Sequence, residues 1–337
     1  MSKVKVLSNE DVKKIINLDI AVKAVECAYK QKSNNKGSVW PIVFYEYEHD
    51  VFDLDIRSGN LEDSNAYGLK MISYNENNPS KNLPVVNATA LVFNDKTGEP
   101  LALLNALSIT SYRTGAAAAI AAKYLAKKNS KNLLIIGSGN IAKYSVAATL
   151  YLLPTIENVY IYNARRKLDE KELLTFKEEV NQLLADSNSN LIANFMLVDD
   201  IRKITGISDI IITATPSDKA IIDSSWVLPG THFSCMGAGL VGKQEIDEKL
   251  FSKAKVFADD EKLCLEQGEA QAAYKKKIIT SFDGELGEVL LGTKSGRSSD
   301  NDITIFDSVG LFLQDLATSI ELIEEANRKE IGIEIEL

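Results

Sequence analysis

A glycine-spaced turn in the middle of the chain has the chemistry of a phosphate-binding site. Residues 133–136 are four branched apolar residues in a row, which is typical of a strand buried on both faces of a parallel sheet. Gly137, Gly139 and Ala142 follow at the spacing Gly-x-Gly-x-x-Ala, ahead of a stretch with the composition of a helix. In such a turn the first glycine permits a tight bend and the second lets backbone amides approach a pyrophosphate. The helix start adds free N–H groups and a positive dipole end, so we predict a dinucleotide-binding turn.

The residues after the next predicted strand bear on which dinucleotide would bind. That strand covers residues 158–162, and Asn163 stands where a ribose-reading carboxylate belongs. A carboxylate would accept hydrogen bonds from a ribose 2′-hydroxyl and repel a 2′-phosphate, whereas Asn163 followed by Arg165 and Arg166 does the reverse. The pattern favours NADP(H) and leaves NAD(H) open. The alternative interpretation is that the two arginines only begin a solvated helix.

The hydrophobic pattern predicts the elements that must position this turn. Helices are expected at residues 8–16, 18–32, 116–126, 169–184 and 308–327, the third of them opened by residues 111–115. Strands that read as a mostly antiparallel sheet are expected at residues 42–45, 51–56, 67–73, 87–93 and 100–104. Strands that alternate with helices, as in a parallel sheet, are expected at residues 133–136, 158–162, 195–198, 209–216, 231–237 and 255–258. The acidic end, residues 331–337, is expected to be frayed.

Composition narrows the possible partners and the cellular compartment. The net charge of -9 and the pI near 5.0 argue against a nucleic acid or an anionic membrane surface as partner. Three cysteines, Cys27, Cys235 and Cys264, lie far apart without a pairing pattern, which fits a reducing cytoplasm. The two histidines, His49 and His232, are widely separated in the sequence. We therefore do not expect a histidine-based metal site, and we expect no bound metal. No signal-peptide core or membrane-spanning apolar run is expected.

Several further motifs occur in one order along the chain and carry a family resemblance. They include Gly68-Leu69-Lys70, Arg113-Thr114-Gly115, the glycine turn, and Phe306-Asp307-Ser308-Val309-Gly310. With these motifs the chain resembles the ornithine cyclodeaminase/mu-crystallin family. The resemblance implies an α/β fold in which a Rossmann dinucleotide-binding domain, residues 114–307, is inserted into an α+β substrate-binding and dimerisation domain, residues 1–113 plus 308–337. It also implies a homodimer formed through the sheet of that second domain.

The resemblance assigns roles to individual residues. Lys70 matches the substrate-binding lysine, and Arg113 matches an arginine that touches both the substrate carboxylate and the cofactor. Arg57 is expected to replace a substrate arginine that the family carries near residues 43–46, where this chain has none. Val309 and the position of Gly239 are expected beside the substrate. The expected cofactor-binding residues are Arg113, Thr114, Gly137, Gly139, Asn140, Ile141, Asn163, Arg165, Arg166, Thr213, Thr215, Met236, Gly237, Lys243 and Ser308.

Blander readings of the charged residues compete with these roles. Lys70 lies in the apolar alternation of a strand, where it could simply guard an edge strand against aggregation. Arg113, expected in the first turn of a helix, could be solvated, although that is a poor place for a cation without an anionic ligand. We interpret Asp315 as structural. Glu269, Glu285 and Glu288 could lie near the cleft, but we interpret them as solvated loop carboxylates.

The glycine at position 239 bears on whether the chain catalyses oxidoreduction or deaminating cyclisation. Cyclodeaminases and the related alanine dehydrogenases carry a catalytic Asp at this position, and a glycine can neither take a proton nor hold an iminium by charge. We therefore expect an NAD(P)-dependent oxidoreductase that interconverts a small L-amino acid and its imine, with Lys70 and Arg113 as the catalytic residues. One alternative is the deaminating cyclisation of ornithine to proline or a homologue. The other is a small-molecule binding protein that needs NADPH and has no turnover.

Overall fold

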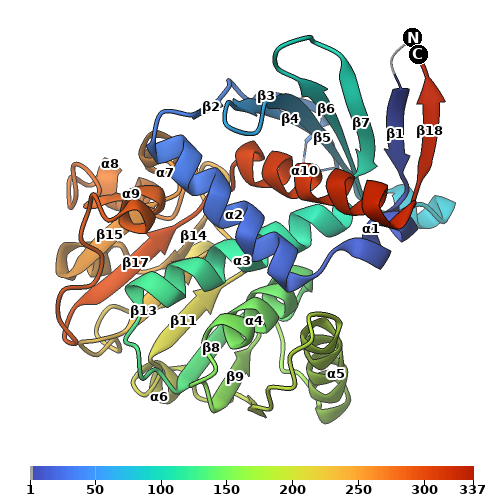
Figure 1. Ribbon diagram of the computed structural model, residues 1–337. Coiled ribbons are helices and arrows are strands. Elements are labelled where there is room, and N and C mark those ends of the chain that lie inside the picture. The colour runs from blue at the N-terminus through green and yellow to red at the C-terminus, as the bar shows by residue number, and fades with distance from the viewer. Residues whose placement is uncertain (1–2, 50) are drawn as a thin grey trace. The chain divides into compact units, whose positions relative to one another are not determined.

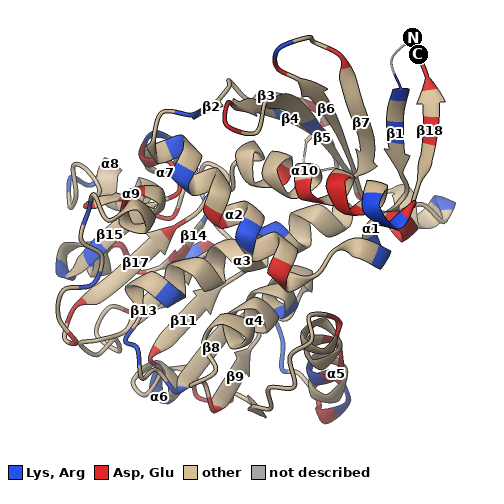
Figure 2. Cartoon of the chain, viewed as in Figure 1, with Lys and Arg blue, Asp and Glu red and all other residues tan. Residues whose placement is uncertain are grey.

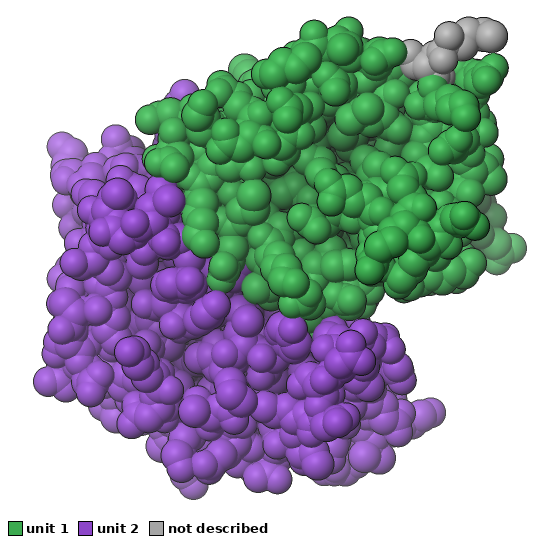
Figure 3. Space-filling view, in the orientation of Figure 1, with its two compact units in different colours: residues 1–113, 311–337 green, residues 114–310 purple. Residues whose placement is uncertain are grey.

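The chain divides into two compact units in a computed structural model that describes residues 3–49 and 51–337. Unit 1 comprises Met1–Arg113 and Leu311–Leu337, and unit 2 comprises Thr114–Gly310 (Figure 3). The domain boundary expected at Ser308 differs slightly from the second boundary of the units. Ser308, Val309 and Gly310 stay with unit 2 because Asp259 accepts hydrogen bonds from the Ser308 hydroxyl and from both following backbone N–H groups.

Unit 1 is built on a mixed sheet whose described strands run in the order β18-β1-β7-β6-β5-β4-β2, with β3 paired to β4 (Figure 1). All of its pairings are antiparallel except that of β1 with β7. The strands are β1 (Lys3–Leu7), β2 (Gly37–Val39), β3 (Val43–Glu48), β4 (Phe52–Leu61), β5 (Ala66–Asn75), β6 (Val86–Asn94), β7 (Pro100–Asn105) and β18 (Ile333–Glu336).

The frayed chain end predicted from the sequence is wrong, because residues 333–336 form β18 against β1. Val6 pairs with Ile333 and Val4 with Ile335 in an antiparallel register. Glu334 lies 3.5 Å from the ammonium groups of both Lys3 and Lys5. The strand therefore forms from backbone pairing with complementary charge along its exposed edge.

Helices cover one face of this sheet, and they are α1 (Asn9–Ile15), α2 (Leu18–Ser33) and α10 (Phe312–Lys329), with the short 3₁₀ helix η1 (Asn78–Lys81) in a loop. Ser8 and Asp11 form the capping box at the start of α1, and Asn17 caps α2. Helix α10 packs on β4, β5, β6 and α2. It begins later than expected, because Gly310 has a φ of +77° and Leu311 is extended.

Helix α3 (Leu107–Leu125) begins well before the expected start at residue 116. The side chain of Asn105 accepts the Leu107 N–H at 3.1 Å, whereas Ser111 donates back to the Leu107 carbonyl inside the helix. Arg113 therefore lies within the helix and not in its first turn, so the expected unfavourable dipole position does not exist. The division between the two units falls inside this helix, after Arg113.

Unit 2 contains a parallel sheet with the described strand order β10-β9-β8-β11-β13-β17-β15-β16 and a separate pair, β12 and β14. The strands are β8 (Asn132–Ile136), β9 (Asn158–Tyr162), β10 (Asn194–Leu197), β11 (Ile210–Thr213), β12 (Asp218–Ile222), β13 (His232–Cys235), β14 (Gln244–Ile246), β15 (Ala254–Ala258), β16 (Gly284–Glu285) and β17 (Ile303–Asp307). The helices are α4 (Asn140–Leu152), α5 (Glu170–Asp186), α6 (Ile201–Thr205), η2 (Glu248–Lys253), α7 (Glu261–Gln267), α8 (Gln271–Lys275) and α9 (Leu286–Leu291). The α/β fold class and its parallel sheet are confirmed.

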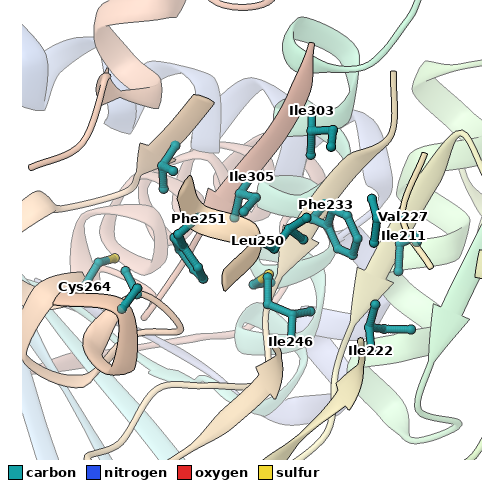
Figure 4. Packing of buried hydrophobic residues seen from close by; sticks show 14 of the residues in the cluster. Ile211, Ile222, Val227, Phe233, Ile246, Leu250, Phe251, Cys264, Ile303 and Ile305 are labelled. Carbon is teal, nitrogen blue, oxygen red and sulfur yellow. The ribbon is translucent and has the colours of Figure 1, made fainter. Parts of the chain in front are cut away.

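The parallel sheet packs against an apolar core, as its continuous hydrophobic strands require. Strands β8, β11 and β13 carry no Lys, Arg, Asp or Glu, while α5 is banded with both charges (Figure 2). Phe233, Ile246, Leu250 and Ile305 are among the side chains that pack together there (Figure 4). The strand order reverses between β8 and β11, and ligands of such sheets bind beyond the carboxyl ends of the strands at that point.

Candidate functional site

The glycine turn lies at the end of β8 with the geometry that its spacing predicts. Gly137 has a φ of +118°, and a Cβ there would lie 2.6 Å from the Ala214 carbonyl oxygen, so a side chain is excluded. Gly139 is the N-cap of α4, and a Cβ there would meet no atom within 4 Å. A side chain at Gly139 would therefore only fill the space in front of the helix start. Ala142 is fully buried in the first turn of α4.

A cavity of about 630 Å³ opens over this turn at the carboxyl ends of β8 and β11. Gly137, Gly139, Asn163, Arg165, Thr215 and Lys243 line it, all of them predicted cofactor residues. The empty space beyond Gly139, the exposed start of α4 and the cations Arg165 and Lys243 fit a pyrophosphate-containing dinucleotide. Asn140 and Ile141 form the first turn of α4, where their backbone N–H groups begin the helix.

The ribose-reading loop is held by its own hydrogen bonds. The Asn163 amide donates to the Ser138 hydroxyl at 2.9 Å, and its oxygen accepts the backbone N–H groups of Arg165 and Arg166. The guanidinium of Arg166 is already bound by the carboxylate of Glu172, and this pair raises the pKa of Arg166. Arg165 and not Arg166 is therefore the cation of this loop that lines the cavity over the glycine turn.

One buried carboxylate, that of Glu245, ties together two loops that follow neighbouring strands. It accepts hydrogen bonds from the hydroxyls of Thr213 and Thr215 at 2.7 Å each, from the Thr215 N–H at 2.7 Å and from the Gly237 N–H at 3.0 Å. The hydroxyl of Thr213 is thus bound to Glu245, and of these two threonines it is Thr215 that lines the cavity. Burial raises the pKa of Glu245, an effect that the four donors oppose.

Three more buried carboxyl groups repeat this arrangement in unit 2. Glu269 accepts the N–H groups of Glu245 and Ile246, Asp307 accepts those of Glu269 and Ala270, and Asp259 holds residues 308–310. Burial raises the pKa of Asp307 to about 8 and that of Glu269 well above its usual range. The reading of Glu269 as a solvated loop carboxylate is wrong, since its side chain is fully buried. The roles of Asp259 and Asp307 were missed, although Asp259 directly follows β15 and Asp307 is the last residue of the buried strand β17.

Unit 1 contains a second cluster of charged side chains around Lys70. Its ammonium group donates to the carboxylate of Asp315 at 2.7 Å and to the hydroxyl of Thr110 at 3.2 Å. Arg113 lies 3.4 Å from the same Asp315 oxygen through Nε and donates to Gln314 at 3.0 Å through a terminal nitrogen. Burial lowers the pKa of Lys70 to about 8, although Asp315 raises it. Lys70 lies on β5, between β4 and β6, so it is not an edge-strand lysine.

Arg57 belongs to the same face of the sheet. It pairs directly with Lys70 in the register of β4 and β5, so both side chains point the same way, and its Nε donates to Asp55 at 2.8 Å. Among the described residues the cluster combines three cations, Lys70, Arg113 and Arg57, with the carboxylates of Asp55 and Asp315. It therefore has an excess of positive charge, which suits a carboxylate ligand.

The other predicted residues lie in loops of unit 2. Gly239 does not have a positive φ, and the one atom of the described residues within 4 Å of a Cβ there would be the Val309 carbonyl oxygen, at 3.8 Å. The Met236 N–H donates to the Thr213 carbonyl at 2.8 Å, and Ser308 donates its hydroxyl to Asp259 at 2.8 Å. Thr114 is buried in α3. Arg57, Lys70 and Arg113 belong to unit 1, and all the other predicted site residues belong to unit 2.

Metal sites and membrane-spanning helices each have requirements that can be compared with residues 3–49 and 51–337. No group of His, Cys, Asp and Glu side chains in these ranges could hold a metal ion. None of the described helices combines the length and apolar character needed to cross a bilayer.

The sequence and the fold match known proteins over nearly their full length. The model of the ornithine cyclodeaminase/mu-crystallin family matches residues 2–330. Alanine dehydrogenase of Archaeoglobus fulgidus is 36% identical over 332 residues, covering 98% of this chain and 97% of that protein. An archaeal alanine dehydrogenase dimer with bound NAD superposes with a TM-score of 0.88 at 34% identity, covering 100% of both chains. Thermococcus litoralis Δ¹-pyrroline-2-carboxylate reductase in complex with NADH and L-proline superposes with a TM-score of 0.87 at 31% identity, covering 98% of this chain and 99% of that chain.

Proposed function

Because the chain belongs to the ornithine cyclodeaminase/mu-crystallin family, we propose that it is a nicotinamide-dependent oxidoreductase that interconverts a small L-amino acid and its imine. The observation that carries the proposal is the surplus positive charge around Lys70 and Arg113, which matches an amino acid carboxylate. The reaction also requires a place for the dinucleotide, for which the open glycine turn of unit 2 is suited. Relatives that act as an alanine dehydrogenase and a pyrroline-2-carboxylate reductase support the same reaction class.

Each cation has a distinct task in this reaction. The forked guanidinium of Arg113 binds the substrate carboxylate, which leaves the α-carbon oriented for hydride transfer. A bound reduced nicotinamide supplies the hydride when the imine is reduced. Lys70 then donates one proton to the nitrogen, and in the oxidative direction it accepts one. Since burial lowers the pKa of Lys70 to about 8, the reductive rate should fall as the pH rises through that value, and the oxidative rate should rise.

The cofactor preference is the finer part of the proposal. We propose that NADPH binds more tightly than NADH, because Asn163 cannot repel a 2′-phosphate and Arg165 lines the cavity. Arg166 contributes less, since Glu172 already neutralises its charge. The NAD and NADH found in the two similar structures make NAD(H) the competing possibility.

The assembly that we propose is a homodimer formed through β3 and its neighbours. Val43, Phe44, Tyr45 and Tyr47 are each more than half exposed on this strand, and Tyr47 stacks on Phe52 with ring centroids 4.5 Å apart. Tyr47 also contacts Tyr45, with ring centroids 4.7 Å apart, and exposed apolar side chains gathered in this way are typical of a protein interface. Light scattering after size exclusion tests it, with Tyr45→Asp expected to give monomers. We retain the cytoplasm as the proposed location, on the scattered cysteines of the sequence.

An absorbance screen at 340 nm tests the reaction. NADPH and NADH are each offered with 2-oxo acids plus ammonia or amines, and with cyclic imines. A parallel assay follows ammonia and proline from ornithine with catalytic amounts of NAD⁺. Consumption of reduced cofactor in the first set supports the proposal. Activity only in the second set would show a cyclodeaminase, and cofactor binding with no turnover in either would show a binding protein, and both outcomes would contradict the proposal.

A further inference from the structure

Asp315 lies between the cations of the charged cluster around Lys70, although it is not on the sheet that carries Lys70. It is on α10, one turn from the helix start, and its side chain is fully buried. One of its oxygens, Oδ1, lies 2.7 Å from the Lys70 ammonium on β5 and 3.4 Å from Nε of Arg113 on α3. A single carboxylate oxygen therefore joins two cations that come from two other elements.

The surroundings of Asp315 are not those of a group selected for stability alone. Its second oxygen, Oδ2, is buried and accepts no hydrogen bond from the described residues, and Nε of Arg113 likewise makes no hydrogen bond there. A buried ion pair with unsatisfied polar atoms is often less stable than well-packed apolar side chains in the same place. This buried ion pair therefore costs folding free energy, which points to a role other than packing.

The neighbouring residue fixes the helix that carries Asp315. Gln314 accepts the Arg113 guanidinium and the Leu311 N–H through its oxygen, and its amide donates to the Tyr29 hydroxyl at 2.6 Å. The start of α10 is therefore held against α3 and α2 by one buried amide. Asp315 acts from a fixed position, as a preorganised site requires.

We propose that Asp315 is the positioning residue of the substrate site, which holds the Lys70 ammonium and the Arg113 guanidinium together for one bound amino acid. The inference rests on the proposed function, in which Lys70 transfers a proton and Arg113 binds a carboxylate. Asp315 acts through these two side chains.

The charges that face Lys70 give this role a measurable signature. Asp315 on α10 favours the protonated ammonium, while Arg113 on α3 and Arg57 on β4 oppose it; Thr110 on α3 adds a neutral hydroxyl, and Ala90 is its partner on β6. Burial is the largest influence, and it lowers the pKa of Lys70 to about 8. Removing the Asp315 charge leaves only influences that lower this pKa further.

The decisive variant is Asp315→Asn, with Asp315→Glu as the conservative variant and Glu324→Gln, on the exposed side of α10, as the matched control. Asp315→Asn should reduce kcat for imine reduction by roughly 10²-fold. It should also move the alkaline limb of the pH profile down by about one unit or more, while the NADPH dissociation constant changes less than about twofold. Asp315→Glu should keep the limb in place with a lower kcat, and Glu324→Gln should match the parent throughout.

A second measurement is independent of turnover and separates this inference from the proposed function. The pKa of Lys70 can be followed by NMR of ¹³C-labelled lysine side chains, assigned with Lys70→Arg. A lower pKa in Asp315→Asn than in the parent supports the inference even if no substrate is found. The inference is overturned if Asp315→Asn leaves the Lys70 pKa unchanged, or if it leaves both kcat and the alkaline limb of the pH profile unchanged. If Asp315→Asn does not fold, Asp315→Glu decides, because a parental kcat in that variant would exclude a positioning role.

Discussion

Glu269 accepts the backbone N–H of Glu245 at 2.7 Å, so that one buried carboxyl group supports the residue that carries another. Glu245 in turn fixes Thr215 and Gly237, the loop residues that follow β11 and β13. Asp307 holds Glu269 by its backbone N–H. The loops at the carboxyl ends of the parallel strands are therefore shaped by a series of buried carboxyl groups, each binding the main chain that carries the next.

Glu245→Gln should weaken cofactor binding more than it weakens the fold. The amide can accept fewer hydrogen bonds than the carboxylate, and it brings two donors to a place already surrounded by the donors of Thr213, Thr215 and Gly237. We expect the NADPH dissociation constant, measured by fluorescence titration, to rise about tenfold, or about 1.4 kcal/mol. Glu248→Gln is the control, because the Glu248 side chain binds Lys276 and Gln244 instead. Equal cofactor affinity in the parent and Glu245→Gln would contradict this role.

Arg165→Ala should reduce the affinity for NADPH by about tenfold and leave that for NADH almost unchanged, because only the former carries a 2′-phosphate. Arg166→Ala should have the smaller effect, since Glu172 binds its guanidinium. Asn163→Asp should reverse the preference by repelling the phosphate. Titrations at low and high salt provide the check, and the difference between the affinities for NADPH and NADH should narrow as salt is added. A parent protein that prefers NADH, or binds both equally, would refute the proposed preference.

Gly239→Asp should fold normally and gain deaminating activity toward ornithine. The backbone at Gly239 is not left-handed, and a Cβ at this position would have the Val309 carbonyl oxygen as its nearest neighbour, at 3.8 Å. A carboxylate there adds general-base and electrostatic assistance, worth roughly 10²-fold or more. Ammonia release and proline formation are the readouts, and Gly239→Asn controls for the added volume. Robust conversion of ornithine by the parent would show that the missing Asp is not needed.

The free energy of unfolding should decrease as the pH rises from 6.5 to 8, above the range in which the buried His232, with its pKa lowered to about 3, contributes the opposite slope. The pKa of Asp307 is raised by burial from 3.8 to about 8, so the folded state keeps a proton that the unfolded chain has lost. Stability from such a group is complete below the unfolded pKa and is lost as the pH rises through the folded one, at most about 1.4 kcal/mol per pH unit and per proton. Urea denaturation at several pH values measures this slope.

Asp307→Asn should flatten that slope, whereas Asp302→Asn should not. Although burial raises it, hydrogen bonds from Ser298 and Lys255 hold the pKa of Asp302 below its usual range, so this carboxyl stays ionised between pH 5 and 8. If the slope of the parent protein equals that of Asp307→Asn, Asp307 is already ionised in the folded state.

Local signals in the sequence predicted most of unit 2 and less of unit 1. The glycine turn was found because it combines a buried strand, a fixed spacing and a helix start, all within a few residues. The start of α3 was misplaced, because the Asn105 side chain accepts the N–H of Leu107 where the helix begins, and Ser111 already lies inside it. Strand β18 was missed because its stability comes from pairing with β1 at the other end of the chain, which no local pattern reveals.

Buried charges explain what was missed in the site. Asp315 follows Gln314 in an amphipathic helix, and only the three-dimensional packing shows that both face Lys70 and Arg113. The available signal was a carboxylate inside an apolar stripe, which is rare unless the charge has a partner. The same signal marked Asp259 and Asp307 at the ends of buried strands. The sequence locates these carboxylates along the chain, but only the packing of the fold shows which groups they bind.

The alanine-rich stretch of α3 has a consequence for conformational entropy. Residues 116–122 are six alanines and one isoleucine, all fully buried. An alanine has no rotamers to lose, so this stretch is buried with almost no loss of side-chain freedom, while a lysine or methionine would lose about 1.5–2 kcal/mol each. Its close packing at Gly115, where a Cβ would lie 2.5 Å from the Tyr144 carbonyl, leaves no room for larger side chains. The alanines of this stretch therefore have no side-chain disorder to gain on heating, and they can become disordered only if the backbone unwinds.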